Sequence, residues 1–408
     1  MKCRFCNTEL VDTFIDLGTS PASNSFLTIN ELDEPEMYYP LKVMVCHSCF
    51  LVQVDEYKSH ADIFNDDYAY FSSYSKSWLL HSSRYVDMIT KRLNLSNKSH
   101  VIEIASNDGY LLQYFKEKDI PCLGIEPTTN TAKIAAEKGI ETIVDFFNVS
   151  LAKELVKKNR KADLIIGNNV LAHDPHLNEL VEGLSISLKE TGVITMEFPH
   201  LLNLIIYNQF DTIYHEHFSY FSLYSVKQIF EAQALVIFDV DEIPTHGGSL
   251  RIYAKHKTNS AIQITENVDT VLNKELNAKL MSINGYLNFQ KLSNNIKYQF
   301  LEFLLGCKSG NKTVVGYGAA AKGNTLLNYC GVKNDLISFV VDASTYKQGK
   351  YMPGSRIPVV HEQELKDFKP DFVVIFPWNI KDEIMEQLHY IKDWGGKFVI
   401  PIPKLTIL

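Results

Sequence analysis

The segment DTIYHEHFSYFS, residues 211 to 222, contains four consecutive side chains that can donate or accept a proton: Tyr214, His215, Glu216 and His217. General acid–base catalysis draws on these types of group for its base, its proton donor and the partner that fixes the base's tautomer. If the segment is extended, alternate side chains share a face, so both histidines point one way and Tyr214 and Glu216 the other. A metal site formed by the last three residues is the competing interpretation, although the sequence offers no obvious distant ligand for it.

A second pattern is formed by four of the seven cysteines, which occur as Cys3-x-x-Cys6 and Cys46-x-x-Cys49. Each pair can present two thiolates to one ion, and two pairs complete a tetrahedral zinc site with no open coordination position. A closed site of this kind does no chemistry. We therefore expect a structural zinc ion that organises an N-terminal module over residues 1–75.

Alternating strands and helices are expected to position the acid–base groups. Apolar runs bounded by turn residues predict buried strands, and the segments between them predict helices. Strands that alternate with helices form a parallel sheet, which binds ligands at the carboxyl ends of its strands. In the second predicted domain, residues 76–262, the strands are 101–105, 122–126, 142–146, 163–169 and 192–199.

A helical connection over residues 263–308 leads to a smaller Rossmann-like α/β domain over residues 309–408. This domain begins with a strand, the glycine turn of 316–324 and a helix, and Lys322 lies near the first turn of that helix. Such a turn can hold a phosphate group. It can equally be a scaffold that no longer binds a nucleotide, although Asp342 ends the next predicted strand.

Composition and charge limit the classes of function. With 46% hydrophobic and 22% charged residues among 408, the chain has enough apolar material for several cores. The net charge of −8 argues against a nucleic-acid or membrane-surface binder, because such binding needs a basic field. The N-terminus lacks the apolar core of a signal peptide and no apolar run is long enough to span a membrane, so we expect a cytoplasmic protein.

The segment 101–112, VIEIASNDGYLL, resembles the first motif of class I S-adenosylmethionine-dependent methyltransferases, in which small residues let the backbone approach the cofactor. Here Ala105 and Asn107 replace two of the usual glycines. Glu126 ends the next strand, where a carboxylate can accept both ribose hydroxyls. A dinucleotide fits less well, because Asp108 would direct a negative charge at its pyrophosphate. The resemblance implies S-adenosylmethionine as cofactor. Its expected binding residues are Glu103, Ala105, Asn107, Gly109, Glu126, Asp145, Phe146 and Asn168.

The motifs of nearly the whole chain, in order, resemble the sugar C-methyltransferases. They are the four-cysteine module, 167-GNNVLAHDPH-176, 214-YHEHFSYFS-222, 245-THGGSLRIY-253 and the block from 316 to 379. That family methylates C3 of nucleotide-linked 4-keto-6-deoxyhexoses. The resemblance implies an α/β fold in which a class I methyltransferase doubly wound sheet is flanked by the zinc module and the smaller Rossmann-like domain.

Methylation at carbon requires a base, because a ketone at C4 acidifies the hydrogen on C3 and its removal leaves an enolate. The resemblance implies that Tyr214, Glu216 and His217 line the sugar pocket. We expect His217 to be the base, Tyr214 to donate to the C4 oxygen, and Glu216 to orient the base or bind a sugar hydroxyl. His215 is expected to be structural. His173, which follows the fourth strand, is a second active-site histidine, and the choice between His173 and His217 as base stays open.

The substrate also needs contacts to its sugar and its diphosphate, which cations or backbone N–H groups can supply. Tyr70 and Tyr74 are alternatives for reaching the sugar. The expected substrate-binding residues are Tyr70, Tyr74, Ser249, Arg251, Lys322 and Arg356, with Lys347 and Lys350 as nearby cations. The expected partner is a thymidine, guanosine or cytidine diphosphate sugar, bound by a monomer or weak homodimer. The alternatives are a nicotinamide-dependent oxidoreductase or epimerase that uses the C-terminal glycine turn, and a non-enzymatic zinc-ribbon binding protein.

Overall fold

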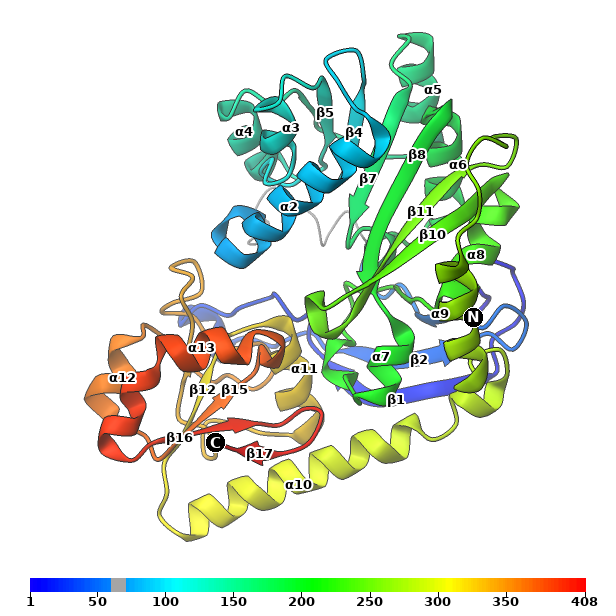
Figure 1. The fold of residues 1–408 in the computed structure, drawn as a ribbon. Helices are drawn as coiled ribbons and strands as arrows, with labels where there is room; N and C mark the ends of the chain where they lie inside the picture. Colours follow the sequence, from blue (N-terminus) through cyan, green and yellow to red (C-terminus); the bar gives the residue numbers. More distant parts are fainter. Residues whose placement is uncertain (60–70) are drawn as a thin grey trace.

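Three β-sheets organise the chain in the computed structural model, which describes residues 1–59 and 71–408 (Figure 1). The central sheet, in cyan and green, lies above the N-terminal strands in blue and the C-terminal domain in orange and red. Tyr70, one of the two tyrosines expected to reach the sugar, lies outside the described residues.

The central sheet has the strand order β10-β11-β8-β7-β4-β5-β6. Its pairs are parallel except those of β11, which runs antiparallel to both neighbours. The middle strands are buried on both faces, as apolar sequences such as VIEI in β4 predict. The seven strands are β4 (Val101–Ile104), β5 (Cys122–Ile125), β6 (Thr142–Ile143), β7 (Ala162–Asn168), β8 (Leu188–Pro199), β10 (Leu235–Ile243) and β11 (Ser249–His256).

Helices cover both faces of this sheet, so it is doubly wound. Residues of α2, α3 and α4 form the apolar layer on one face, and residues of α5, α6, α8 and α9 form the layer on the other. The hydroxyl of Ser75 caps α2 by accepting the N–H of Trp78 at 3.2 Å. The helices are α2 (Lys76–Leu93), α3 (Leu112–Lys116), α4 (Thr129–Glu137), α5 (Val149–Lys157), α6 (Leu177–Ser187), α8 (Leu223–Ala232) and α9 (Glu266–Asn277).

The N-terminal sheet shares its core with other parts of the chain. Its antiparallel strands are β1 (Asp12–Ser20), β2 (Tyr39–Val45), β3 (Val52–Val54) and β9 (Ser219–Tyr220). The last of these begins two residues after His217, which ends the YHEH segment. The sheet packs with α7 (Leu201–Ile206) and with the C-terminal domain into one apolar cluster, whereas the cysteine pairs pack into the core of the central domain. The described N-terminal residues 1–59 of the predicted module therefore share their apolar cores with the other two domains.

The C-terminal domain is a smaller parallel sheet with helices. Its strands are β12 (Val314–Tyr317), β13 (Val340–Val341), β14 (Val359–Val360), β15 (Phe372–Ile375), β16 (Lys397–Ile400) and the antiparallel β17 (Thr406–Ile407). Its helices are α11 (Ala321–Cys330), α12 (Gln363–Phe368) and α13 (Lys381–Gln387). The predicted strand 336–342 shortens to two residues, and the glycine turn precedes α11 as expected.

The connection between the domains contains two helices instead of one helical stretch. Helix α9 ends near Lys279, whose φ of 64° is left-handed, and the N–H of Leu280 bonds back to the Glu275 carbonyl at 2.9 Å. Helix α10 (Phe289–Ser309) then runs along the N-terminal sheet and the C-terminal domain (Figure 1). No helix among residues 1–59 and 71–408 is long and apolar enough to cross a membrane.

Candidate active site

The four paired cysteines come together in a cluster that fits zinc. Their Sγ atoms lie within 4.8 Å of one another, and three of the separations are 3.5, 3.5 and 3.6 Å. Zinc–sulfur bonds of about 2.3 Å in a tetrahedron place the sulfurs about 3.8 Å apart, whereas a disulfide needs about 2 Å. The Gln53 amide and the Ser48 N–H approach two of the sulfurs at 3.3 and 3.4 Å, as donors approach thiolates. The predicted ligands Cys3, Cys6, Cys46 and Cys49 are thus brought to one point.

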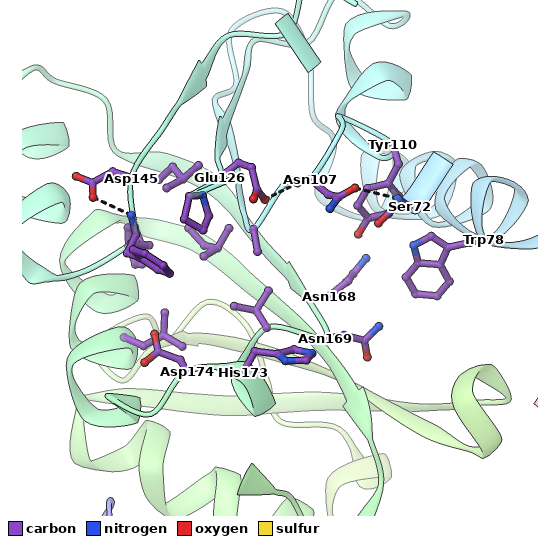
Figure 2. A pocket seen from close by; sticks show the side chains of 18 residues that line it. Ser72, Trp78, Asn107, Tyr110, Glu126, Asp145, Asn168, Asn169, His173 and Asp174 are labelled. Atoms are coloured by element: carbon purple, nitrogen blue, oxygen red, sulfur yellow. Dashed lines mark hydrogen bonds between the residues drawn. The ribbon is translucent and has the colours of Figure 1, made fainter. Parts of the chain in front are cut away.

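A cavity lies at the carboxyl ends of β4, β5 and β7, where the sheet is expected to bind its cofactor. Figure 2 shows Glu126, Asn107 and Ser72 on one side of it and His173 and Asn169 on the other. Six of the eight predicted cofactor residues line this cavity: Ala105, Asn107, Glu126, Asp145, Phe146 and Asn168.

The loop after β4 adopts the conformation that a close cofactor approach requires. Ala105, Asn107 and Gly109 have φ values of 53°, 49° and 73°, all left-handed. The buried Glu126 carboxylate accepts the N–H of Asn107 at 2.8 Å and that of Thr128 at 2.9 Å. Burial raises the pKa of Glu126, and these hydrogen bonds oppose the rise. Ala and Asn can therefore stand where glycines are usual, because the bonded loop holds their backbone in this region.

Glu103 and Gly109 do not line the cavity. Side chains alternate along β4, so Glu103 points to the face opposite its neighbour Ile104, which does line it. Burial raises the pKa of Glu103 well above its usual range. A Cβ on Gly109 would lie 2.4 Å from Ile140 Cδ1, so this position needs glycine for packing. Glu103 therefore lies behind the loop and Gly109 within it, and a direct cofactor contact by either residue stays a prediction.

Tyr214, His217 and His173 form a partly buried cluster beside the cavity. Residues 214–217 make a turn, closed by the His217 N–H and the Tyr214 carbonyl at 3.0 Å, and not the extended segment that we expected. Because a turn brings its first and fourth residues together, the rings of Tyr214 and His217 lie 4.0 Å apart. His173 meets His217 edge-on at 4.7 Å and also lines the cavity. His215 points elsewhere and bonds to the Pro40 carbonyl at 3.1 Å.

Hydrogen bonds define which nitrogen of His217 can act as a base. Its Nδ1–H donates to the Thr212 carbonyl at 2.9 Å, so Nε2 is unprotonated and accepts the Tyr214 hydroxyl at 2.9 Å. Burial and then the nearby His173 lower the pKa of His217 well below its usual value. Burial also lowers the pKa of His173 to about 4. Both imidazoles are therefore neutral near pH 7.

Glu216 makes a separate contact. Its two carboxylate oxygens accept the Asn24 amide at 2.9 and 2.8 Å, and burial raises its pKa to about 7. The Thr212 carbonyl, and not Glu216, fixes the tautomer of His217. One of the two roles expected of Glu216 is thereby corrected, and binding of a sugar hydroxyl stays a prediction.

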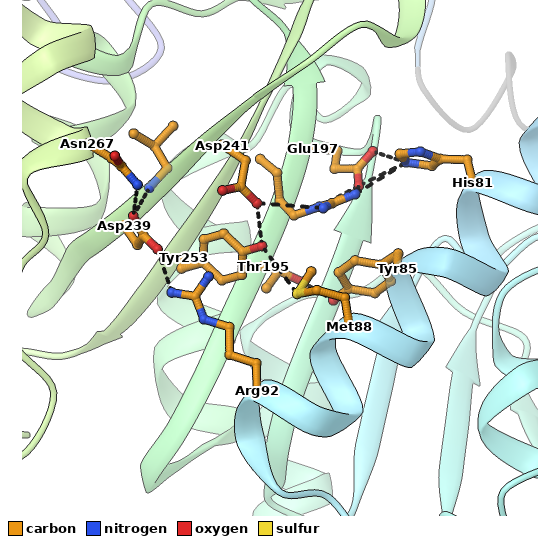
Figure 3. Close-up of polar contacts among 12 residues, drawn as sticks. His81, Tyr85, Met88, Arg92, Thr195, Glu197, Asp239, Asp241, Tyr253 and Asn267 are labelled. Carbon is orange, nitrogen blue, oxygen red and sulfur yellow. Dashed lines mark hydrogen bonds and ion pairs between the residues drawn. The ribbon is translucent and has the colours of Figure 1, made fainter.

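Ser249 and Arg251 are bonded within the central sheet. The side chain of Arg251 is 8% exposed, and its Nε donates to Glu197 at 2.7 Å. Figure 3 shows that His81 of α2 reaches Glu197, at 2.9 Å. Burial opposes ionisation of Glu197, yet its bonds to His81 and Arg251 hold its pKa below the usual value. Ser249 donates to the Thr245 carbonyl at 2.9 Å. Ser249 and Arg251, which were predicted to donate hydrogen bonds to the substrate's phosphates, therefore donate to groups of the protein itself.

The other predicted substrate residues lie at three different places. Lys322 donates to Asn379 at 2.7 Å above the Trp378 ring, and burial lowers its pKa to about 8. Arg356 donates to two backbone carbonyls of the N-terminal segment at 2.6 and 3.3 Å. Tyr74 is 76% exposed. The positive charge of Lys322 contributes to the lowered pKa of His217, after burial and the nearby His173.

Two residues near the cavity were missed by the sequence analysis, Trp78 and His246. Trp78 lines the cavity, and His246 packs edge-on against it with ring centroids 5.3 Å apart. His246 belongs to the motif THGGSLRIY of residues 245–253, but only Ser249 and Arg251 in it were predicted to bind the substrate.

Comparisons with known proteins cover the entire chain. Family models match a putative zinc binding domain over residues 3–64, a methyltransferase domain over 80–238 and a C-methyltransferase C-terminal domain over 244–403. The C-methyltransferase NovU of Streptomyces niveus is 32% identical over 407 residues, which are 100% of this chain and 96% of NovU.

Solved structures resemble about half of the chain. A methyltransferase from Clostridium acetobutylicum, described as S-adenosylmethionine-dependent, has 13% identity and a TM-score of 0.35, and the match covers 44% of this chain and 92% of that one. Another from Anabaena variabilis has 16% identity and a TM-score of 0.36, with 43% and 85% covered.

The parallel sheet with its single reversed strand, β11, and the cavity at its carboxyl edge define a class I methyltransferase. By its match to NovU along its whole length, the chain belongs to the C-methyltransferase family. It is an S-adenosylmethionine-dependent enzyme that carries a four-cysteine zinc-binding segment. The nicotinamide-dependent and non-enzymatic alternatives are therefore set aside.

Proposed function

We propose that the enzyme transfers a methyl group to C3 of a nucleotide-linked 4-keto-6-deoxyhexose, through an enolate, in the formation of branched deoxysugars. The observation that best supports this proposal is the Tyr214–His217 pair beside the cofactor cavity, with a neutral imidazole whose Nε2 accepts the phenol at 2.9 Å. Cofactor binding is assigned to the residues that line the cavity, with Glu126 accepting the ribose hydroxyls. When bound, S-adenosylmethionine supplies an electrophilic methyl group.

His217 is suited to remove the proton from C3. When the sugar enters, its C3 hydrogen takes the place of the Tyr214 hydroxyl at Nε2 of His217. The electron pair of the C3–H bond then stays on the sugar and forms the enolate. The proton moves to Nε2, so the imidazolium forms with its Nδ1–H still bonded to Thr212. With S-adenosylmethionine bound, the C3 carbon would take its methyl group as the sulfur–methyl bond breaks and its electron pair leaves with S-adenosylhomocysteine. Burial of the imidazole keeps Nε2 unprotonated before the reaction.

The enolate oxygen needs donors, since imidazole is a far weaker base than an enolate. The displaced Tyr214 hydroxyl is one such donor. The neutral His173 ring donates its Nδ1–H to the Glu216 carbonyl at 2.7 Å, so its Nε2 carries no proton and His173 is not assigned as a second donor. One well-placed donor to a developing oxyanion stabilises the transition state by about 3 kcal/mol. Glu216, held by Asn24, is assigned to a sugar hydroxyl.

The diphosphate is assigned to the junction with the C-terminal domain. Lys322 lies in the first turn of α11, directly after the glycine turn, and is partly exposed. A helix N-terminus with a lysine favours an anion. Arg251 and Arg356 are less suited, because the structure uses their donors within the chain.

Labelled S-adenosylmethionine and a panel of thymidine, guanosine and cytidine diphosphate 4-keto-6-deoxyhexoses test this proposal by mass spectrometry. We expect one of the sugars to gain a single methyl group. Without cofactor turnover, the wild-type enzyme should exchange the C3 hydrogen with deuterium, whereas His217→Asn should not. His361→Asn, at an exposed position, is the control. Cofactor binding without methylation of any ketosugar contradicts the substrate class, and undiminished exchange in His217→Asn removes His217 as base.

A further inference from the structure

The backbone at His246 adopts a left-handed conformation that few residues other than glycine share. His246 lies in the short helix η5 (Thr245–Gly247) between β10 and β11, with φ of 54° and ψ of 24°. Non-glycine residues are uncommon in this region, although histidine is enriched among those that occur there, and strained positions of this kind cluster at functional sites. Gly247 and Gly248 follow at φ 89° and 109°.

Close packing holds this turn in place. A Cβ on Gly247 would lie 2.4 Å from the Trp378 ring of the C-terminal domain, and a Cβ on Gly248 would lie 2.3 Å from the Asn203 amide. The Gln209 amide also donates to the Gly247 carbonyl at 2.8 Å. The imidazole of His246 is thus presented at a fixed position where the central and C-terminal domains meet.

Two residues of the cofactor cavity hold the imidazole. The Asn169 amide donates to Nε2 at 3.1 Å, and the ring of Trp78 packs edge-on at 5.3 Å. Because Nε2 accepts this bond, the proton of the neutral ring is on Nδ1. No residue in the described part of the chain bonds to Nδ1, and His246 is only partly buried. A proton donor is therefore left available beside Asn169 and Trp78.

The neighbours of His246 place it with the proposed reaction groups. Burial, then the charge of Lys322, lowers its pKa to about 4, and His173 is also near enough to contribute. His246 in turn contributes to the lowered pKa of His217. At neutral pH the ring is uncharged, so it acts as a hydrogen-bond donor and not as an acid.

We propose that His246 is a substrate-binding residue. Its Nδ1–H donates to an oxygen of the ketosugar, and this bond holds the sugar ring between His217 and the cofactor cavity. This assignment rests on the proposed function. It extends the site to the turn between β10 and β11, and it gives the left-handed backbone and the two close-packed glycines a common purpose.

Two amide substitutions separate this role from a structural one. The amide of His246→Asn reaches the place of Nδ1, and asparagine tolerates a left-handed backbone. The amide of His246→Gln reaches the place of Nε2 and can keep the bond to Asn169. Both variants, with wild type, are titrated calorimetrically with S-adenosylmethionine, with the nucleotide ketosugar and with the nucleoside diphosphate alone, and kcat/KM for methyl transfer is measured.

We expect His246→Asn to keep ketosugar affinity and kcat/KM within about threefold, and His246→Gln to lower both about tenfold, the loss of one hydrogen bond. Affinity for the cofactor and for the nucleoside diphosphate should not change in either variant. Three results overturn the proposal. They are equal effects of both substitutions, a loss of ketosugar affinity in His246→Asn alone, and a loss of cofactor affinity in either variant. If the wild-type enzyme binds the ketosugar without methylating it, the proposed function fails, and the binding comparison still tests the role of His246. If the wild-type enzyme does not bind the ketosugar, the proposed function and the role of His246 both fail.

Discussion

Replacement of Arg251 distinguishes a phosphate-binding arginine from one that stabilises the fold. Arg251→Met keeps much of the apolar stem and removes the charge that faces Glu197. Glu197 is 2% exposed on its side chain, so it would be left buried with His81 as its remaining partner at 2.9 Å. The guanidinium also lies 4.7 Å above the Tyr85 ring, a contact that the variant loses.

The expected loss of stability follows from this burial. Breaking a buried ion pair by removing one partner costs about 3 to 5 kcal/mol, because the other charge stays in the interior. A loss of about 3 kcal/mol corresponds to about 150-fold faster hydrogen exchange, at 1.36 kcal/mol per tenfold change. We therefore expect this acceleration for the backbone N–H groups of β8 and β11, measured by exchange and mass spectrometry, which reports on local unfolding in a multidomain chain.

Arg160→Met is the matched control, because Arg160 makes a similar two-bond pair with Glu141 at 2.6 and 2.8 Å but on the surface. Exposed pairs contribute about 0 to 1 kcal/mol, so its effect on exchange should stay below about tenfold. If Arg251→Met exchanges no faster than this control and raises the KM for the nucleotide sugar tenfold, the stabilising role is refuted and the phosphate role is restored.

Three further changes test the remaining parts of the site. Cys46→Ser should remove the zinc ion and lower the melting temperature, whereas Cys122→Ser, outside the cluster, should keep one zinc per chain by elemental analysis. Glu126→Gln removes a charged acceptor and should weaken S-adenosylmethionine binding about 10- to 100-fold by calorimetry; an unchanged Kd contradicts the ribose contact. Since burial raises the pKa of Glu216 to about 7, its carboxylate forms as pH rises through 7, and the rate of C3 exchange should increase between pH 6 and 8. His217, whose pKa is lowered, stays neutral over this range, so Glu216→Gln should give a slow, flat profile.

Several predictions from sequence hold because they depend on local spacing. Two CxxC pairs can serve one ion wherever their strands lead, and the four sulfurs do meet. Apolar runs separated by helices require a parallel sheet, whose carboxyl edge collects Ala105, Glu126 and Asn168 around one cavity. The antiparallel strands β10 and β11 were not among the predicted strands, although they complete the sheet.

Other features depend on partners that are distant in the chain. The positive charge of Arg251 suggested phosphate, but the pairing of β11 with β8 places Glu197 directly opposite it. Alternation along β4 decides that Glu103 faces away from the cavity. Residues 214–217 form a turn, which a hydrogen bond from the His217 N–H to the Tyr214 carbonyl closes. In this turn Tyr214, and not Glu216, contacts the imidazole of His217.

The sequence by itself determined which chemistry the chain can perform, since residue types and short spacings carry the zinc ligands, the cofactor strands and the acid–base groups. Only the tertiary structure decided which of these groups act together. The direction of a side chain, its burial and its hydrogen-bond partner arise from sheet register and packing across more than a hundred residues. For the same reason His246, which is 77 residues from Asn169 in the chain, becomes visible as a site residue only in the folded protein.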